Sequence, residues 1–245
     1  ELRANADADA GTQVIFDQRP ETRDQRLKTQ ARAMTVNYAR ARRILARRDP
    51  ILRDLMRRHG ACGLADSQQT DPFQALVHAI ISQQLSTRAA ATIAARVDAL
   101  LGGVPDAARL GAVSDAQLRS AGLSGQKISY LRALCAHVTG GSLSLETLDS
   151  MSDEEVIAAL TEVKGIGRWT AEMFLMFRLH RPDVLPVGDL GIGKAVQRAY
   201  RLRTLPSPTR LLRIGESWRP YRSVACWYLW ASLSNVAPVV GVNRK

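Results

Sequence analysis

Two glycines that flank one apolar residue, Gly165-Ile166-Gly167, interrupt a long stretch of helical sequence in the second half of the chain. Upstream, Ser152-Asp153-Glu154-Glu155 has the pattern of a capping box, in which a hydroxyl is followed three residues later by a carboxylate. Apolar residues repeat at helical spacing over residues 156–163 and again over residues 169–177. Because glycine takes positive φ without steric cost, the chain can reverse within these few residues. The sequence therefore predicts two helices joined by a tight glycine turn.

The start of the second helix has the features of an anion site. A helix that begins directly after the turn leaves the N–H groups of Gly167, Arg168 and Trp169 pointing outward at the positive end of the helix dipole. Lys164 and Arg168 place two positive charges beside them. A DNA phosphate is therefore the expected ligand. The alternative is an ordinary pair of antiparallel helices in which the glycines only form the turn.

An aspartate follows this motif at the predicted start of the next helix. Asp189 ends a short loop shaped by Pro186 and Gly188, where the next helix is expected to begin. The helix before that loop ends at Arg181-Pro182, because a residue before proline is disfavoured in the helical conformation. An aspartate at a helix start is usually an N-cap. Here the tight loop also directs the carboxylate back toward the glycine turn.

These residues together resemble a known family. The run Val163-Lys164-Gly165-Ile166-Gly167-Arg168-Trp169-Thr170-Ala171, with an aspartate 22 residues after Gly167, is similar to the helix-hairpin-helix DNA glycosylases. Within that family it resembles the 3-methyladenine DNA glycosylase II group. Residues 73–84 and 218–230, the second with a Trp-x-Pro-x-Arg-Ser sequence, extend the resemblance to roughly residues 35–235.

The resemblance implies an all-α fold of two packed helical subdomains with a cleft between them and no N-terminal β domain. No long alternating pattern in the sequence predicts a sheet. One subdomain is expected over residues 70–185, ending in the helix-hairpin-helix of residues 152–180. The other is expected to combine residues 31–69 with residues 186–236. Residues 1–30 are expected to form a poorly ordered arm and residues 237–245 a tail.

The resemblance also implies excision of alkylated purines, chiefly 3-methyladenine, by hydrolysis of the N-glycosidic bond. Breaking that bond develops positive charge on the sugar, and a fixed carboxylate beside C1′ stabilises this charge and orients the attacking water. We assign both roles to Asp189. Family members that also cut the strand carry a lysine two residues after the last glycine of the turn. Trp169 stands there instead, so a monofunctional enzyme without AP-lyase activity is expected.

An extruded alkylated base needs an apolar, aromatic pocket, because electron-deficient rings are attracted to aromatic faces. Trp169, Tyr221 and Trp218 are the expected pocket residues, with core packing as the alternative for the last two. Gln83 is added to the pocket, although an amide that holds the neighbouring turn is the simpler interpretation. Trp230 is interpreted as a core residue.

Further site residues follow from motif positions in the family. A loop residue there fills the gap left by the extruded base, and Gln68 and Gln69 are the candidates, with a solvated loop as the alternative. Hairpins of the family also bind Na⁺ or K⁺ through backbone carbonyls, by position those of Thr161, Val163 and Ile166. No other cofactor is expected. The expected phosphate-binding residues are Lys164, Gly165, Gly167, Arg168 and Thr170.

The charge balance predicts a polyanionic partner. Lys and Arg exceed Asp and Glu by 34 − 23 = 11, and the pI is near 10.3, which agrees with binding to double-stranded DNA. Five arginines between Arg40 and Arg48 are interpreted as the solvated face of a helix. No run of about 18 apolar residues and no signal-peptide pattern is present, so neither a membrane span nor secretion is expected.

Three widely separated cysteines, Cys62, Cys135 and Cys226, contain no Cys-x-x-Cys pair. A disulfide framework, a zinc site and an iron–sulfur cluster are therefore not expected. We expect a monomer in the cytoplasm of a bacterium, associated with the nucleoid, or in the nucleus of a eukaryote. Two other functions stay open: excision of oxidised or mispaired bases by the same kind of enzyme, and DNA binding without catalysis.

Overall fold

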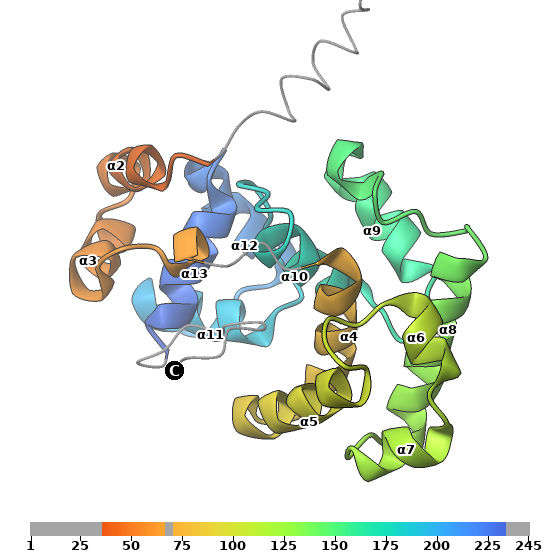
Figure 1. The fold of residues 1–245 in the computed structure, drawn as a ribbon. Helices are drawn as coiled ribbons and strands as arrows, with labels where there is room; N and C mark the ends of the chain where they lie inside the picture. Colours follow the sequence, from red (N-terminus) through yellow and green to blue (C-terminus); the bar gives the residue numbers. More distant parts are fainter. Residues whose placement is uncertain (1–35, 67–70, 234–245) are drawn as a thin grey trace, which may run out of the picture. The chain divides into compact units, whose positions relative to one another are not determined.

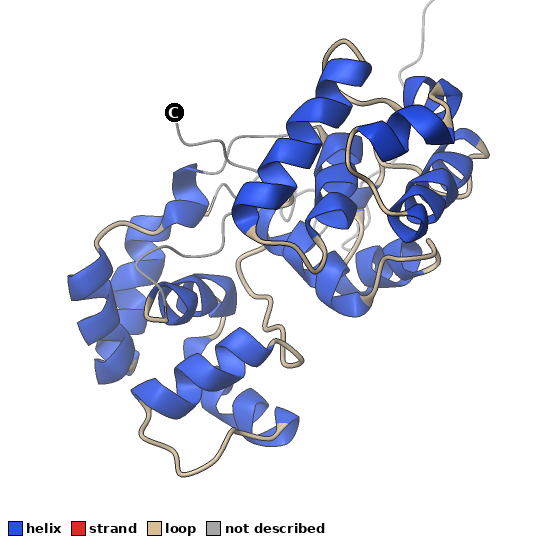
Figure 2. Ribbon diagram, turned by 90° about the horizontal axis from the view of Figure 1, so that it is seen from below, coloured by secondary structure: helices blue, strands red, loops and turns tan. Residues whose placement is uncertain are grey.

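The computed structural model describes residues 36–66 and 71–233, all within the second of the two units into which the chain divides, residues 35–245. Every regular element in these residues is a helix, and no strand occurs among them (Figures 1 and 2). The expected all-α fold is confirmed for this part of the chain, whereas the expected arm of residues 1–30 and tail of residues 237–245 lie outside it. The α-helices are α2 (Tyr38–Arg48), α3 (Pro50–His59), α4 (Pro72–Ser82), α5 (Thr87–Leu100), α6 (Ala107–Ala112), α7 (Asp115–Ser120), α8 (Gly125–Thr139), α9 (Asp153–Thr161), α10 (Arg168–Phe177), α11 (Leu190–Ala199), α12 (Pro208–Gly215) and α13 (Arg222–Ala231), with 3₁₀ turns η1 (Gly63–Asp66), η2 (Leu148–Ser150) and η3 (Glu216–Trp218).

Side-chain caps begin many of these helices where the local sequence predicts them, whereas no side chain caps the start of α10 or α13. Asp49 and Asp71 each accept hydrogen bonds from N–H groups of the first turn, and proline follows each of them at the first helical position. Ser152 and Glu155 form the complete capping box that the sequence predicts for α9. None of the helices in residues 36–66 and 71–233 has the length and apolar character needed to cross a bilayer.

Helices from both ends of the described chain pack together. α13 lies against α2 and α3 and also against α11 (Figure 1). A second set forms around α4, which contacts α5, α8 and α10, while α8 also packs against α6 and α7. α9 packs against α10. The boundaries expected at residues 70 and 186, and the cleft, stay predictions.

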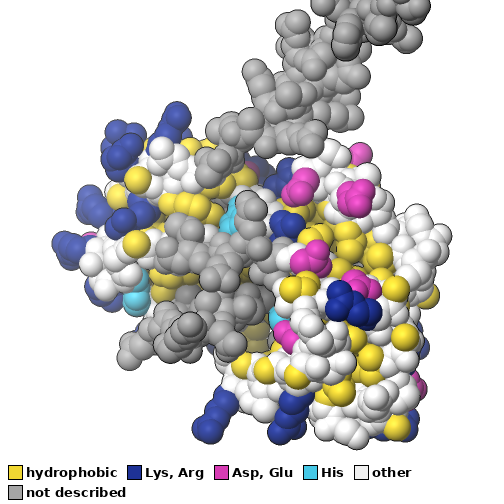
Figure 3. Space-filling view, in the orientation of Figure 1, with side chains coloured by type: hydrophobic (Ala, Val, Ile, Leu, Met, Phe, Trp, Pro, Cys, Tyr) yellow, Lys and Arg dark blue, Asp and Glu magenta, His cyan; other side chains and the backbone are white. Residues whose placement is uncertain are grey.

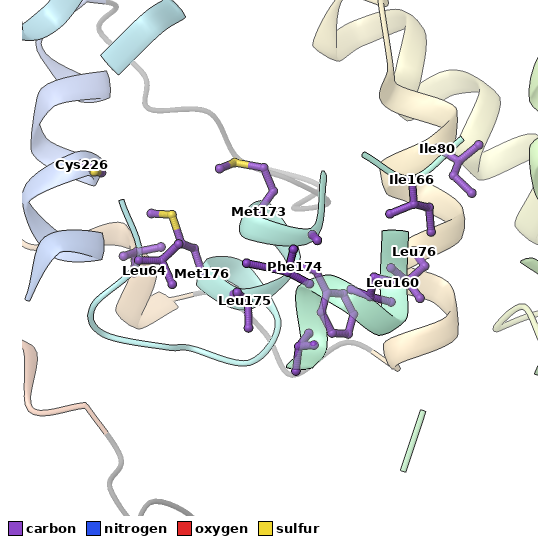
Figure 4. Close-up of a cluster of buried hydrophobic side chains, with 14 of the residues drawn as sticks. Leu64, Leu76, Ile80, Leu160, Ile166, Met173, Phe174, Leu175, Met176 and Cys226 are labelled. Atoms are coloured by element: carbon purple, nitrogen blue, oxygen red, sulfur yellow. The ribbon is translucent and has the colours of Figure 1, made fainter. Parts of the chain in front are cut away.

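The core is built around α10. Residues 170–176 of this helix are all buried, which requires apolar side chains on most of its circumference. Figure 4 shows Met173, Phe174, Leu175 and Met176 among side chains from α4, α9 and α13. Only the start of α10, at Arg168 and Trp169, is exposed. Any chemistry that this helix supports is therefore confined to its N-terminal end, next to the glycine turn.

Candidate functional site

The turn between α9 and α10 depends on one glycine. Gly165 has a φ of +93°, a conformation that residues with a Cβ rarely adopt. A Cβ at this position would also lie 2.2 Å from Cγ of Tyr130, on α8. Gly167, by contrast, has a φ of −95° and nothing within 4 Å of an added Cβ. Gly165 is therefore required by both backbone conformation and space, whereas Gly167 serves as the N-cap of α10.

Two neighbouring helices hold the glycine turn. Nε2 of Gln83, just past the end of α4, donates to the Gly165 carbonyl over 2.9 Å. Nζ of Lys164 donates to Oγ of Ser129, on α8, over 3.3 Å. The Gln83 amide thus makes the structural contact that was the simpler interpretation of the sequence, and its place in a base pocket stays a prediction. Both contacts fix the turn relative to helices that are distant in sequence.

The residues predicted to bind phosphate differ in exposure and in their contacts within the protein. Lys164 is exposed. The two terminal nitrogens of Arg168 donate to both carboxylate oxygens of Glu154, at 3.1 and 2.6 Å, and its Nε donates to Glu172 over 3.2 Å. The side chain of Thr170 is buried, so only its backbone N–H remains to meet a phosphate. Two internal carboxylates already neutralise Arg168, which the sequence did not predict.

Glu172 is a buried carboxylate one turn into α10, with 5% of its surface exposed. Burial raises the pKa of Glu172, the ion pair with Arg168 opposes this rise, and the charge of Asp189 adds to it. The folded protein therefore holds the Glu172 proton more tightly than the unfolded chain does. From this group alone, the free energy of unfolding falls as the pH rises through the carboxyl range.

Asp189 is the N-cap of α11 and is held by three N–H donors. Its Oδ1 accepts a hydrogen bond from the Ile192 backbone over 2.7 Å and from Nε1 of Trp230 over 3.1 Å. Its Oδ2 accepts one from Nε1 of Trp169 over 2.6 Å. The carboxylate therefore faces the start of α10, as the loop geometry predicts. Its two oxygens differ: Oδ1 has two donors, whereas the ring that reaches Oδ2 is 47% exposed.

Trp230 is a site residue that the sequence did not reveal. Its ring stacks on Phe177 with centroids 6.1 Å apart, and its N–H reaches the carboxylate from α13. A Cβ at Gly191 would lie 2.9 Å from Oδ1 of Asp189 and 3.3 Å from Nε1 of Trp230, so the glycine leaves room for this bond. Asp189 and Trp230 are 41 residues apart, and only the packing of α13 against α11 brings them together.

The loop that carries Asp189 is anchored by the start of α13. Nε of Arg222 donates to Asp183 over 2.7 Å. The Ser223 hydroxyl accepts a hydrogen bond from the Val184 backbone over 3.0 Å. These are the arginine and serine of the Trp-x-Pro-x-Arg-Ser sequence. That motif therefore fixes the position of the carboxylate-bearing loop.

The other two aromatic residues predicted for the pocket, Trp218 and Tyr221, are more buried than Trp169. Trp218 has no exposed surface, and its Nε1 donates to the buried carboxylate of Asp49 over 3.1 Å. The prediction of Trp218 as a pocket residue is wrong, because its ring fills the core and its N–H satisfies a buried acceptor. Tyr221 is half-buried against the core, and its role in the pocket stays a prediction.

The predicted wedge residues, Gln68 and Gln69, lie outside the described residues. Gln84, in the turn between α4 and α5, is exposed and has a φ of +57°. A non-glycine residue in this region is strained by roughly 1–3 kcal/mol and often marks a functional position. Its neighbour Gln83 ties the same turn to the glycine turn, so Gln84 is one residue away from a contact with the hairpin.

Comparison with known families identifies the family to which this chain belongs. The family model described as HhH-GPD superfamily base excision DNA repair protein matches residues 77–220, which is more than half of the chain. The chain belongs to the HhH-GPD superfamily. The matched span contains the glycine turn and Asp189, and it ends before α13 and Trp230.

Relatives of this HhH-GPD protein include DNA-3-methyladenine glycosylase 1 of Schizosaccharomyces pombe, which is 36% identical over 166 residues, covering 66% of this chain and 73% of the relative. A putative DNA-3-methyladenine glycosylase of Bacillus subtilis is 32% identical over 168 residues, covering 66% of this chain and 58% of the relative. A solved structure of the Schizosaccharomyces pombe 3-methyladenine DNA glycosylase with abasic DNA superposes with a TM-score of 0.72 at 32% identity, covering 79% of this chain and 96% of that one.

The HhH-GPD hairpin offers backbone oxygens at the end of α9. Thr161 is the last residue of that helix, where the helix dipole places partial negative charge. The Val163 carbonyl accepts the N–H of Ile166 over 3.0 Å and keeps a second lone pair. The carbonyls of Thr161, Val163 and Ile166 therefore fit the predicted Na⁺ or K⁺ in donor chemistry, and its binding stays a prediction.

Proposed function

We propose that this protein is a monofunctional DNA glycosylase that hydrolyses the N-glycosidic bond of alkylated purines of the 3-methyladenine type in double-stranded DNA, and so initiates base excision repair. The observation that carries the proposal is the pairing of Asp189 with Trp169, because a fixed carboxylate and an exposed indole meet there at the start of α10. The names of the relatives support the same function. We propose that it acts as a monomer.

The two oxygens of Asp189 have separate roles in the proposed reaction. The donors on Oδ1 hold the orientation of the carboxylate. Oδ2 approaches C1′ of the extruded nucleotide, because its one donor among the residues that the structure describes is an exposed ring. As the C1′–N bond breaks, its electron pair leaves with the cationic purine, which departs as a neutral base, and Oδ2 stabilises the positive sugar. Water then bonds to C1′ and gives a proton to the carboxylate.

Trp169 supplies the aromatic face for the base. A cationic base over an indole gains about 0.5–2 kcal/mol, and the exposed ring is available to an extruded nucleotide. Because Trp169 has no amine, a Schiff base with the sugar cannot form at this position. The enzyme therefore leaves an abasic site without cutting the strand. Tyr221 and Gln83 are the proposed further contacts of the base.

The glycine turn is the proposed grip on the DNA backbone. No side chain caps the start of α10, so its first N–H groups are free for a phosphate, and exposed Lys164 adds positive charge. A Na⁺ or K⁺ on the hairpin carbonyls would add positive charge beside the same phosphate. We propose that exposed Gln84, next to Gln83, contacts the duplex beside the extruded base.

The test of this function is incubation of the protein with methylated duplex DNA, followed by chemical identification of the released base. We expect release of 3-methyladenine and an abasic strand that stays intact until treated with alkali. Release only from duplexes with oxidised or mispaired bases would favour the second function. Salt-sensitive binding with no base released from any duplex would show a binding protein without catalysis.

Trp230→Phe tests how far the bond to Oδ1 orients the carboxylate. Phenylalanine keeps a ring against Phe177 and removes the N–H. A hydrogen bond to a charged group is worth about 1.5–3 kcal/mol, so base release from methylated DNA should fall about 10- to 100-fold at unchanged DNA affinity. The matched control is Trp227→Phe in the same helix, which should keep full activity. Equal rates in the two variants would show that the bond does not serve catalysis.

Glu154→Gln tests whether the internal ion pair competes with DNA for Arg168. The substitution removes the charge that holds the guanidinium on the surface of α9. We expect tighter binding to duplex DNA, with the slope of log K against log salt steeper by up to about 0.9, the value for one more phosphate contact. Glu162→Gln removes an exposed carboxylate near the same turn without touching Arg168 and should have a smaller effect. Affinity no higher in Glu154→Gln than in this control would rule out the competition.

A further inference from the structure

An arginine-rich surface on α2 and α3 lies on elements other than those of the proposed active site. Lys and Arg side chains gather over these two helices in Figure 3. Six exposed arginines define this surface, which we call the α2–α3 arginine surface: Arg40, Arg43, Arg47, Arg53, Arg57 and Arg58. Of the two acidic residues on α2, α3 and the cap between them, Asp49 is buried and Asp54 is half-exposed. The surface therefore carries a large uncompensated positive charge.

The arginines form ordered rows. Arg40, Arg43 and Arg47 are spaced i, i+3, i+7, so they share one face of α2, opposite the buried Ala41 and Leu45. Arg53 and Arg57 are likewise spaced i, i+4 on α3. In the part of the chain that the structure describes, the side chains of Arg43, Arg47 and Arg53 have no ion-pair or hydrogen-bond partner. Like charges at these spacings repel one another, so the rows lower helix stability unless an anion neutralises them.

A hollow extends the same positive surface. Its volume is about 440 Å³, and it is bordered by Arg58 of α3 together with Arg198 and Arg201 at the end of α11. Arg201 has a φ of +53°, in the left-handed region that non-glycine residues rarely occupy. The Asp54 carboxylate also borders this hollow, so three guanidinium groups face one carboxylate there. The remaining positive charge favours phosphate, because guanidinium forms paired hydrogen bonds with phosphate oxygens.

We infer that the α2–α3 arginine surface binds the phosphate backbone of a second segment of double-stranded DNA, independently of base sequence. The inference rests on the proposed function only in taking DNA as the polyanion that the protein meets. With a rise of 1.5 Å per residue, the row from Arg40 to Arg47 spans about 10 Å, over which one strand of B-DNA carries about three phosphates. A second contact of this kind keeps the protein on DNA while the hairpin searches for a lesion.

The test is a salt titration of DNA binding by fluorescence anisotropy, with undamaged duplexes of about 12 and about 30 base pairs. The variant Arg43→Gln, Arg47→Gln, Arg53→Gln removes three unpaired charges, and the matched control places lysine at the same positions. On the long duplex we expect the slope of log K against log salt to lose about two to three units in the glutamine variant, at 0.9 per phosphate contact. The lysine variant should keep the wild-type slope. Thermal unfolding shows whether both triple variants are folded. If the triple glutamine variant is unfolded, the three single glutamine variants are measured instead, and each is expected to reduce the slope by about 0.9.

Each other outcome overturns the inference. An unchanged slope and affinity in the glutamine variant would show a merely solvated surface. Loss of binding to anionic lipid vesicles or to polyglutamate, with an unchanged slope on DNA, would assign the surface to a membrane or an acidic protein. Base release from the short methylated duplex, measured at low salt in the same variants, should stay at the wild-type rate. If the wild-type protein releases no base, the proposed function is wrong. The slope on undamaged DNA still tests whether the α2–α3 arginine surface binds DNA.

Discussion

Asp189→Asn is expected to lower base release from methylated duplex DNA by about 10³-fold or more, which corresponds to about 4 kcal/mol of lost transition-state stabilisation. The amide cannot neutralise positive charge on the sugar, and it cannot take a proton from the attacking water. Asparagine remains a good N-cap for α11, so the variant should fold and should bind DNA with wild-type affinity. Single-turnover release of base and anisotropy on the same duplex measure the two quantities separately.

The matched control for this prediction is Asp106→Asn, the same substitution at the half-exposed N-cap of α6. It should leave base release unchanged, which separates loss of the reacting carboxylate from loss of a helix cap. Melting temperatures show whether the new amide nitrogen, which must face an indole N–H of Trp169 or Trp230, disturbs the fold. Turnover within about tenfold of wild type in Asp189→Asn would remove this carboxylate from the mechanism.

Gly165→Ala is expected to be the most destabilising single-methyl substitution in the hairpin. The new Cβ would lie 2.2 Å from the Tyr130 ring, and the backbone would keep a φ of +93°. Overpacking costs about 1–3 kcal/mol and an unfavourable φ about 1–3 kcal/mol, so the free energy of unfolding should fall by about 2–6 kcal/mol. Urea titration measures the loss, and DNA affinity should fall with it because the turn is distorted.

Two further variants separate the causes in this prediction. Gly167→Ala, in the same turn, has space for a methyl group and a negative φ, so it should cost at most about 1 kcal/mol, the value for a changed N-cap. In a Tyr130→Ala background the clash disappears, and Gly165→Ala should then cost only the backbone strain. Equal losses for the two glycine variants would show that neither the tyrosine ring nor positive φ restrains the turn.

Contacts between residues close in sequence could be predicted here, whereas the contacts that distant residues make with the site could not. The capping box at Ser152, the turn at Gly165 and the cap at Asp189 each depend on interactions within a few residues, and the structure contains all three. Trp218 was misassigned, because its pattern in the sequence does not show whether a ring fills the core or lines a pocket. The ring is buried in the core, where the distant acceptor Asp49 satisfies its N–H.

The sequence by itself determined that the chain is helical, that a glycine turn precedes a capped helix, and that an aspartate begins the helix after the next loop. The tertiary structure alone decided that Trp169 and Trp230 converge on that aspartate and that Glu154 and Glu172 already occupy Arg168. The physical reason is the range of the interactions. Helix caps and turns depend on backbone geometry over a few residues, whereas these hydrogen bonds and ion pairs exist only after buried apolar surface has packed α10 against α9 and α13 against α11.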